Sequence, residues 1–298
     1  MPWRTFSEDA RLQRLFRDNF DQLTPENELK WANTEPLPGV FTFDEADQLV
    51  SYATAHGKRI RGHTLVWGNQ LPKWVRDGHW SRDSLLLFMR EHIDREMSRY
   101  RGRINEWDVV NEAIAGNGGY EQNVFLRVIG PKYVEYAFRY AHAADPDAKL
   151  YYNDMGIGLP GHPATLGVLR MVADLKRKGV PIHGIGIQAH MSTRYHLSQS
   201  QVADTMRRVA ELGLDVAITE MDVRINSPGT PAQRLEDQRR VYEGVARACR
   251  AQPRCTSFTT WGISDKHSWL GQSALPLAFD SAYGAKPAWP TIVRALRE

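Results

Sequence analysis

The chain is poor in cysteine, has no long apolar segment and carries little excess charge. Two cysteines among 298 residues exclude a scaffold built from several disulfides. No apolar run approaches the roughly 20 residues that a membrane-spanning helix requires. The net charge is +3, and the basic residues are scattered among acidic ones, which argues against a nucleic-acid-binding surface. With 42% hydrophobic and 24% charged residues, the composition is typical of a globular protein.

Two sequence features concern the cellular compartment of the protein, and each allows two interpretations. The N-terminal residues, which begin Met1-Pro-Trp-Arg, are not followed by the apolar core of a signal peptide, so either the protein is cytoplasmic or a leader has been removed. Cys249 and Cys255 are close enough in sequence to pair where a helical segment meets a strand, which would indicate an oxidising compartment. Two separate buried thiols are the alternative.

Helical and strand-like patterns alternate along most of the chain. Apolar residues recur at intervals of three and four in the predicted helices, whereas the predicted strands are short, β-branched and almost continuously apolar, as in parallel sheets. Helices are expected at 43–56, 82–100, 125–143, 164–178, 201–212, 231–250 and 288–296, and strands at 21–25, 58–67, 104–112, 149–153, 182–188, 215–220 and 255–261.

This alternation favours a single-domain (β/α)8 TIM barrel over residues 1–298, with a doubly wound sheet as the alternative. Seven strands are identified, and the first strand of the barrel is short or truncated. Residues 2–6 are the available segment for it. Either that segment closes the barrel or the natural chain begins further upstream.

Two glutamates end strand-like apolar runs, and a barrel would bring both to one cleft. Glu112 follows Asn111 at the end of one run, and Glu220 ends another, with Asp222 just beyond. A lone glutamate after a strand is more often a helix cap or an ion-pair partner. Two of them beside an amide and a second acid favour a paired-carboxylate hydrolase, and carboxyl groups about 5 Å apart would serve a retaining glycosidase.

Further polar and aromatic residues follow the other strands, as expected for sugar binding. Amides and acids hydrogen-bond hydroxyl groups, while indole faces stack on pyranose rings. A core role for the histidines and tryptophans is the alternative, and no close His, Cys and Asp spacing supports a metal site. The residues in question are Glu26, Asn27, Lys30, His63, Trp67, Asn153, Asp154, Gln188, His190, Trp261 and Asp265.

At these positions the sequence resembles the glycoside hydrolase family 10 xylanases. The resemblance runs from about residue 21 to the C-terminus and covers six motifs in order. They are Thr24-Pro-Glu-Asn-Glu-Leu-Lys-Trp31, Arg61-Gly-His-Thr-Leu-Val-Trp67, Trp107-Asp-Val-Val-Asn-Glu112, Gln188-Ala-His190, Ile218-Thr-Glu-Met-Asp222, and Thr260-Trp-Gly-Ile-Ser-Asp265 with Trp269.

The resemblance implies retaining hydrolysis of internal β-1,4-xylosidic bonds without a cofactor or metal. In this reading Glu220 is the nucleophile and Glu112 the general acid/base, His190 and Asp222 orient Glu220, and Asn111 binds the sugar 2-hydroxyl. The implied substrate-binding set is Glu26, Asn27, Lys30, His63, Trp67, Gln70, Asn111, Gln188, Trp261 and Trp269. The family often has a disulfide at the positions of Cys249 and Cys255, which favours a secreted or periplasmic protein. A monomer acting on xylan or xylo-oligosaccharides is expected.

The sequence departs from the family pattern at a few positions. Gly68 stands where the family usually has histidine, and Met155-Gly156 stand where it often has Tyr-Asn, so a stacking platform on the leaving-group side is lost. Hydrolysis of short xylo-oligosaccharides, aryl glycosides or another β-glycan is therefore an alternative, as is a catalytically silent sugar-binding barrel.

Overall fold

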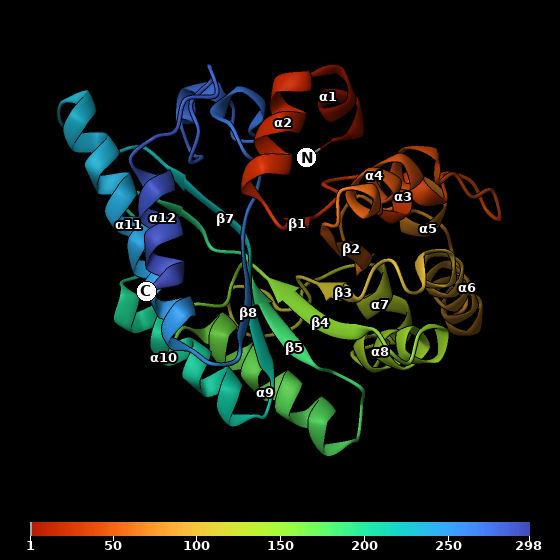
Figure 1. Ribbon diagram of the computed structural model, residues 1–298. Coiled ribbons are helices and arrows are strands. Elements are labelled where there is room, and N and C mark those ends of the chain that lie inside the picture. Colours follow the sequence, from red (N-terminus) through yellow and green to blue (C-terminus); the bar gives the residue numbers. More distant parts are fainter. Residues whose placement is uncertain (1) are drawn as a thin grey trace.

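The strands form one parallel sheet that curls into a nearly closed barrel with the helices outside it (Figure 1). The computed structural model describes residues 2–298, and Met1 lies outside the described residues. Every ladder is parallel, which confirms the expected barrel class. The strands are β1 (Gln22–Leu23), β2 (Arg59–Trp67), β3 (Glu106–Asn111), β4 (Lys149–Asp154), β5 (Gly184–Ile187), β6 (His190–Ser192), β7 (Asp215–Arg224) and β8 (Cys255–Thr260).

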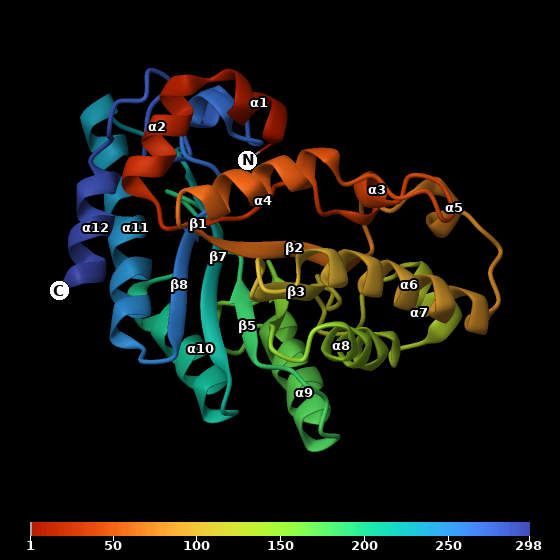
Figure 2. The same ribbon diagram turned by 45° about the vertical axis from the view of Figure 1, so that its right-hand side comes forward.

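The helices surround this sheet, with α6 on one side of the barrel and α11 and α12 on the opposite side (Figure 2). They are α1 (Trp3–Glu8), α2 (Ala10–Asn19), α3 (Trp31–Thr34), α4 (Asp44–Ala55), α5 (Lys73–Arg76), α6 (Arg82–Tyr100), α7 (Val124–Ile129), α8 (Tyr133–Ala144), α9 (Pro163–Arg177), α10 (Gln199–Glu211), α11 (Pro231–Ala251) and α12 (Ala288–Arg297), with short 3-10 helices at Asp265–His267 and Gln272–Ala274.

Local sequence signals set several of these boundaries. Capping boxes begin α10 at Ser198 and α11 at Thr230, because each hydroxyl accepts from the backbone N–H three residues on. The expected helix at 125–143 is two helices, since Gly130 has a φ of 85° and separates α7 from α8. Cys249 of α11 forms a disulfide with Cys255 of β8.

The first residues do not supply a strand. Residues 3–8 form α1, and Phe6 is fully buried between Tyr52 of α4 and Phe16 of α2, with ring centroids 4.8 and 5.7 Å away. The possibility that residues 2–6 close the barrel is therefore wrong. Among residues 2–298, β8 pairs with β7 and β1 pairs with β2, and no ladder joins β8 to β1.

A buried ion pair joins β2 to β3 inside the barrel. Arg61 is fully buried and donates to both carboxylate oxygens of Asp108, at 2.5 and 3.1 Å. Its guanidinium also lies 4.4 Å from the ring centroid of Tyr151, and His63 Nδ1 lies 3.0 Å from Asp108 Oδ2. Burial alone would raise the pKa of Asp108, but Arg61 and His63 outweigh it and hold that pKa below its ordinary value of 3.8.

Replacing Asp108 with Asn should lower the free energy of unfolding by about 3–5 kcal/mol at pH 7, because it breaks a buried ion pair and leaves Arg61 with Glu106, 3.2 Å away, as its one carboxylate partner among the described residues. A lowered pKa stabilises the fold above the unfolded value and loses that effect as the pH falls through the folded value. The difference between wild type and Asp108→Asn should therefore narrow below about pH 4. Urea unfolding at pH 7 and pH 3.5 checks this, and an equal difference at both values would contradict it.

Candidate active site

A cluster of three amide side chains connects the two glutamates. Gln188 Nε2 donates to Glu112 Oε1 at 2.9 Å and to Asn111 Oδ1 at 3.2 Å. Asn153 Nδ2 donates to the same oxygen of Asn111 at 2.9 Å and to Glu220 Oε1 at 2.6 Å. Glu112 follows β3 and Glu220 lies in β7, yet both carboxylates contact this one cluster. The structure thus brings the two glutamates to the same cleft.

Glu220 lies beside a charged imidazole. His190 Nε2 is 3.4 Å from Glu220 Oε2, and its Nδ1 is 2.9 Å from Asp222 Oδ2, which also accepts from Trp269 Nε1 at 2.8 Å. Burial opposes the imidazolium, but the hydrogen bonds and charges of Asp222 and Glu220 outweigh it and raise the pKa of His190 to about 10. His190 is therefore positively charged at neutral pH and places that charge beside the Glu220 carboxyl group.

Glu112 has a different environment and a constrained backbone. Trp67 Nε1 donates to its Oε2 at 2.8 Å, and its φ is 55°, a left-handed value that is costly for a residue with a side chain. The next two backbone N–H groups, of Ala113 and Ile114, donate to the hydroxyl of Tyr152 at 2.9 and 3.2 Å. These contacts fix the chain directly after Glu112.

The Tyr152 hydroxyl donates in turn to Asp154. Asp154 is almost fully buried and accepts from the backbone N–H of Gly156 at 2.7 Å. Burial raises the pKa of Asp154 to about 6, although the hydrogen bonds from Tyr152 and Gly156 oppose the shift. The chain from Asp154 through Tyr152 to the backbone therefore supports the conformation of Glu112.

A second polar cluster lies beside Trp67. Lys30 Nζ donates to Gln70 Oε1 at 2.5 Å and to Asn27 Oδ1 at 3.1 Å, and it lies 5.0 Å from the ring centroid of Trp67. Burial lowers the pKa of Lys30, whereas the negative charges of Glu220, Glu26 and Glu112 oppose that shift. The ammonium group of Lys30 therefore interacts electrostatically with both Glu112 and Glu220.

The tryptophans and His63 take positions around the same cleft. Trp261 is largely buried and packs edge-on against His63, with ring centroids 5.2 Å apart, while His63 Nδ1 is 4.0 Å from Glu220 Oε1. Trp269 is 53% exposed and packs edge-on against His190, with ring centroids also 5.2 Å apart. An indole anchored at its nitrogen and exposed on its face is suited to contact a ligand.

Two supporting residues differ in how well the sequence indicates them. Asn153 ends a predicted strand, so its position was identified but its bridging role was not. Tyr152 lies one residue earlier within an apolar strand, where nothing in the local pattern distinguishes it from a core residue.

Among residues 2–298, no group of three or more His, Cys, Asp or Glu side chains is arranged to hold a metal ion. No helix in the described part of the chain is long and apolar enough to cross a membrane.

Replacing Tyr152 with Phe should lower the free energy of unfolding by about 1–3 kcal/mol, because two buried N–H groups lose their acceptor. The rate constant kcat should fall about tenfold through misplacement of Glu112, with little change in KM. Tyr140→Phe on α8 is the matched control. Urea unfolding and steady-state kinetics check both effects, and reduced stability with an unchanged kcat would mean that the hydroxyl supports the fold alone.

Comparison with known proteins agrees with this geometry. The model of the glycosyl hydrolase family 10 matches residues 2–295. Endo-1,4-beta-xylanase A of Fusarium oxysporum f. sp. lycopersici is 43% identical over 261 residues, which cover 85% of this chain and 79% of that protein. Endo-1,4-beta-xylanase B of Humicola insolens is 40% identical, and the match covers 99% of this chain and 83% of that protein.

Solved structures show the same relationship. Xylanase 10B of Thermotoga petrophila, determined with xylobiose, has a TM-score of 0.95 and 36% identity, covering 99% of this chain and 91% of that one. The intracellular xylanase TsXylA of Thermoanaerobacterium saccharolyticum has a TM-score of 0.92 and 36% identity, covering 98% of this chain and 93% of that one. The chain therefore belongs to glycosyl hydrolase family 10.

Proposed function

We propose that the protein is a retaining endo-β-1,4-xylanase in which Glu220 is the nucleophile and Glu112 the general acid/base. The observation that carries this assignment is the shared amide cluster, which holds the two carboxylates in one cleft but in unlike surroundings. Glu220 lies beside the imidazolium of His190, which favours an ionised nucleophile. Glu112 lies half-buried beside an indole and a neutral amide, with no cation bonded to it among the contacts of residues 2–298.

The reaction takes two displacements. In the first, Glu220 attacks the anomeric carbon and forms a covalent glycosyl-enzyme, while Glu112 gives its proton to the departing glycosidic oxygen. In the second, Glu112 takes a proton from water, which attacks the anomeric carbon and releases Glu220. The same carboxyl group thus serves as acid and then as base, and the anomeric configuration is retained.

Asn111 is assigned to the 2-hydroxyl of the sugar at the cleavage point. Its Oδ1 already accepts from Asn153 and Gln188, which fixes the side-chain orientation and leaves Nδ2 as the group that can bind a hydroxyl. A hydrogen bond to this hydroxyl strengthens in the transition state. Asn153 and Gln188 are therefore positioning residues for Asn111 as well as for the glutamates.

The glycon side of the substrate is assigned to the polar cluster around Lys30. Ammonium, amide and carboxylate groups bind sugar hydroxyls, and the tryptophan faces contact the apolar faces of the rings. This set consists of Glu26, Asn27, Lys30, His63, Gln70 and Gln188, with Trp67, Trp261 and Trp269. Xylan and xylo-oligosaccharides are the substrates that these groups suit.

The leaving-group side is a cavity of about 360 Å³ beside Glu112. Met155 is 60% exposed at this cavity. Gly68 also lines it, and a Cβ built at Gly68 would lie 2.9 Å from Cβ of Asn123, so a larger residue there requires Asn123 to move. In place of an aromatic stacking platform, the leaving-group side therefore has open space and the flexible side chain of Met155.

The remaining assignments concern the protein as a whole. We assign residues 1–298 to one catalytic domain that acts as a monomer without a cofactor and without nucleic-acid or membrane partners. The disulfide between α11 and β8 supports secretion or export to the periplasm, since such bonds persist in oxidising compartments. A cytoplasmic location is the alternative, and one similar xylanase is described as intracellular.

Variants of the two glutamates should separate their roles. Glu220→Ala should abolish turnover of every substrate, because no nucleophile remains. Glu112→Ala should slow xylan hydrolysis by about 10²–10⁴-fold but should affect an aryl xylobioside much less, because a good leaving group needs no proton. Glu211→Ala, on the surface of α10, is the control. Near-native activity of Glu220→Ala would overturn the assignment.

The stereochemistry of cleavage and the lengths of the products distinguish an endo-xylanase from the alternative functions. Proton NMR during cleavage of xylohexaose should show the β-anomer first, whereas α-anomer first would mean inversion. Early release of mixed oligosaccharides from polymeric xylan supports endo-hydrolysis, and exclusive release of short products supports the oligosaccharide alternative. Binding without turnover would support the silent barrel.

Replacing Met155 with Tyr should restore a stacking surface on the leaving-group side. The KM for xylopentaose should fall about three- to tenfold, because a ring–sugar contact contributes on the order of 1 kcal/mol. Met155→Leu, which adds no ring, should leave KM near the wild-type value. Initial rates over a range of xylopentaose concentrations provide the measurement, and equal KM values for the two variants would contradict a stacking role at this position.

A further inference from the structure

Helices α1 and α2 meet at a corner that is fixed by its own contacts. The side-chain amide of Gln13 donates to the backbone carbonyl groups of Phe6 and Ser7, at 2.9 and 3.1 Å. Asp9 stands between the two helices, and its Oδ1 caps α2 by accepting from two backbone N–H groups of the first turn, at 3.0 and 3.1 Å. Because the ring of Phe6 is also fully buried, α1 and α2 form one unit, which we call the α1–α2 corner.

The segment between β8 and α12, residues 261–287, is joined to this corner through Asp9. Asp9 Oδ2, which takes no part in the cap, accepts from Lys266 Nζ at 3.0 Å and from the hydroxyl of Tyr283. His267 Nε2 lies 2.9 Å from the same hydroxyl. Figures 1 and 2 both show the segment that follows β8 beside α1 and α2. Lys266 and His267 belong to the 3-10 helix that ends two residues before Trp269.

Asp9 is the main outside anchor of this 3-10 helix. Within residues 2–298, the side chains of Lys266 and His267 form hydrogen bonds and ion pairs only with Asp9 and Tyr283. Other bonds from the segment to β7 and α11 are made by residues 274–276. The hydrogen bond from Tyr283 holds the pKa of Asp9 below its ordinary value of 3.8, so Asp9 is ionised at neutral pH. Its charge thus fixes the backbone that leads to Trp269.

The beginning of α1 contacts the segment that carries Asn27 and Lys30. The backbone N–H of Trp3, in the first turn of α1, donates to Glu28 Oε1 at 2.6 Å. Glu28 Oε2 accepts from the backbone N–H of Asn27 at 3.1 Å, and the whole residue is buried. Asn27 Oδ1 accepts in turn from Lys30 Nζ. Glu28 therefore holds the backbone of this polar cluster against α1.

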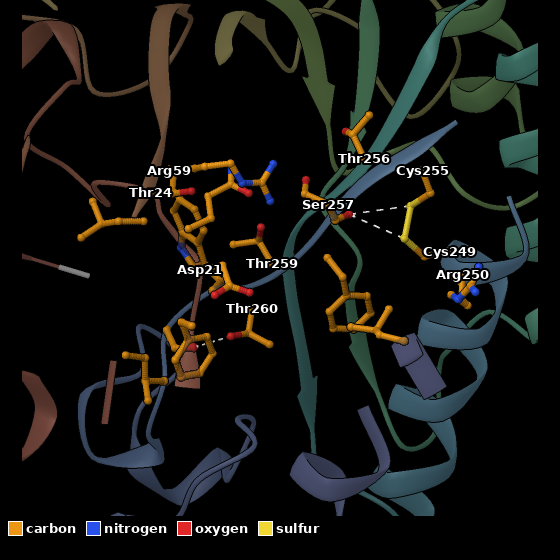
Figure 3. Close-up of a pocket in the computed structure, with 18 of the residues that line it drawn as sticks. Asp21, Thr24, Arg59, Cys249, Arg250, Cys255, Thr256, Ser257, Thr259 and Thr260 are labelled. Atoms are coloured by element: carbon orange, nitrogen blue, oxygen red, sulfur yellow. Dashed lines mark hydrogen bonds between the residues drawn. A yellow bond between two sulfur atoms is a disulfide. The ribbon is translucent and has the colours of Figure 1, made fainter. Parts of the chain in front are cut away.

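The two segments that the α1–α2 corner contacts follow β1 and β8. These strands border one cavity of about 420 Å³, which Asp21 and Thr24 line beside β1 and Thr259 and Thr260 line in β8 (Figure 3). Within residues 2–298 no ladder joins the two strands. The connection through α1 runs from Glu28 to Asp9 by side-chain contacts and does not involve the cavity.

We propose that Asp9 and Glu28 are positioning residues for the glycon side of the cleft, because they hold its two walls against one common support. This role rests on the proposed function, in which Asn27 and Lys30 bind glycon sugars on one wall and Trp269 contacts them on the other. A spacing that is fixed before the substrate arrives reduces the conformational freedom lost on binding. The two contacts should therefore act on KM rather than on kcat.

Conservative variants remove each connection but keep the helix cap. Asp9→Asn keeps one oxygen for the cap of α2, since Asn caps as well as Asp, but it places an NH₂ group where Oδ2 accepts from Lys266 and Tyr283. Glu28→Gln likewise leaves one acceptor oxygen for two backbone N–H groups. Asp18→Asn, at an exposed carboxylate of α2, is the matched control.

The kinetic effect is measured on an aryl xylobioside. Asp9→Asn and Glu28→Gln should each raise KM about threefold, as expected for the loss of a partly exposed ion pair or of one hydrogen bond, and should leave kcat within about twofold of wild type. Asp18→Asn should match wild type in both constants.

Two further measurements separate positioning from a general loss of stability. Amide hydrogen exchange should accelerate in the segment that each variant releases, at residues 265–270 for Asp9→Asn and at residues 26–30 for Glu28→Gln. In a Trp269→Ala background, Asp9→Asn should raise KM no further, because the residue through which it acts is gone.

Two results would overturn the proposal. A lowered Tm with an unchanged KM in both variants would mean that these contacts support the fold alone. The same increase in KM for Asp9→Asn with and without Trp269 would mean that Asp9 acts through other residues.

Failure of the proposed function would look different, because wild type would then leave both xylan and the aryl xylobioside intact. The dissociation constant of xylotriose, measured by calorimetry, would in that case take the place of KM. An increase in this constant together with faster exchange at residues 265–270 in Asp9→Asn would still support the positioning role, and no change in either would overturn it.

Discussion

The two hydrogen bonds accepted by Asn111 Oδ1 determine how the rest of the cleft is arranged. Their donors are Asn153 in β4 and Gln188 directly after the neighbouring strand β5, and each also binds one of the glutamates. An amide has a fixed set of donors and acceptors, so rotation of Gln188 or Asn153 breaks a contact to a carboxylate, and rotation of Asn111 removes the acceptor that both of them share. The separation of Glu112 and Glu220 is therefore set by short neutral groups rather than by long flexible ones, which suits a reaction that requires a defined gap.

Two hydrogen-bonded pairs, each of a buried aspartate and a histidine, lie beside this amide cluster. Asp108 holds His63 on one side with the help of Arg61, and Asp222 holds His190 on the other with the help of Trp269. In each case a buried carboxylate accepts from more than one donor, which offsets the cost of removing its charge from water, although both donors to Asp222 reach the same oxygen, Oδ2. These contacts fix the orientation of the imidazole rings of His63 and His190. Glu220 is within 4.0 Å of both histidines, so the two aspartates position both imidazoles against the same carboxyl group.

The sequence is most informative where short-range periodicity decides the structure. The helices at 82–100 and 231–250 and the strands beneath the glutamates were predictable, because apolar spacing and capping residues are local. Parallel strands end at the same rim, so the proximity of Glu112 and Glu220 followed from the fold class. The break at Gly130 was missed, since the apolar pattern continues through it while the backbone does not. Tyr152 was missed because its partners are backbone groups of the segment after β3, about 40 residues away in the sequence, which no local pattern reveals.

Barrel closure also depends on contacts between residues far apart in the sequence. This is why the secondary structure of residues 2–6 could not be predicted from the sequence. A short segment such as 2–6 becomes helix or strand according to the neighbour that it finds, and Phe6 finds Tyr52 of α4 rather than a sheet edge. The lack of a ladder between β8 and β1 within residues 2–298 does not loosen the rim of the cleft. Trp261 follows β8, but its backbone N–H donates to Met221 of β7 at 3.1 Å and its ring packs against His63 of β2. Contacts at the rim thus connect the last strand to both β7 and β2, so the arrangement around Glu220 does not depend on a ladder between β8 and β1.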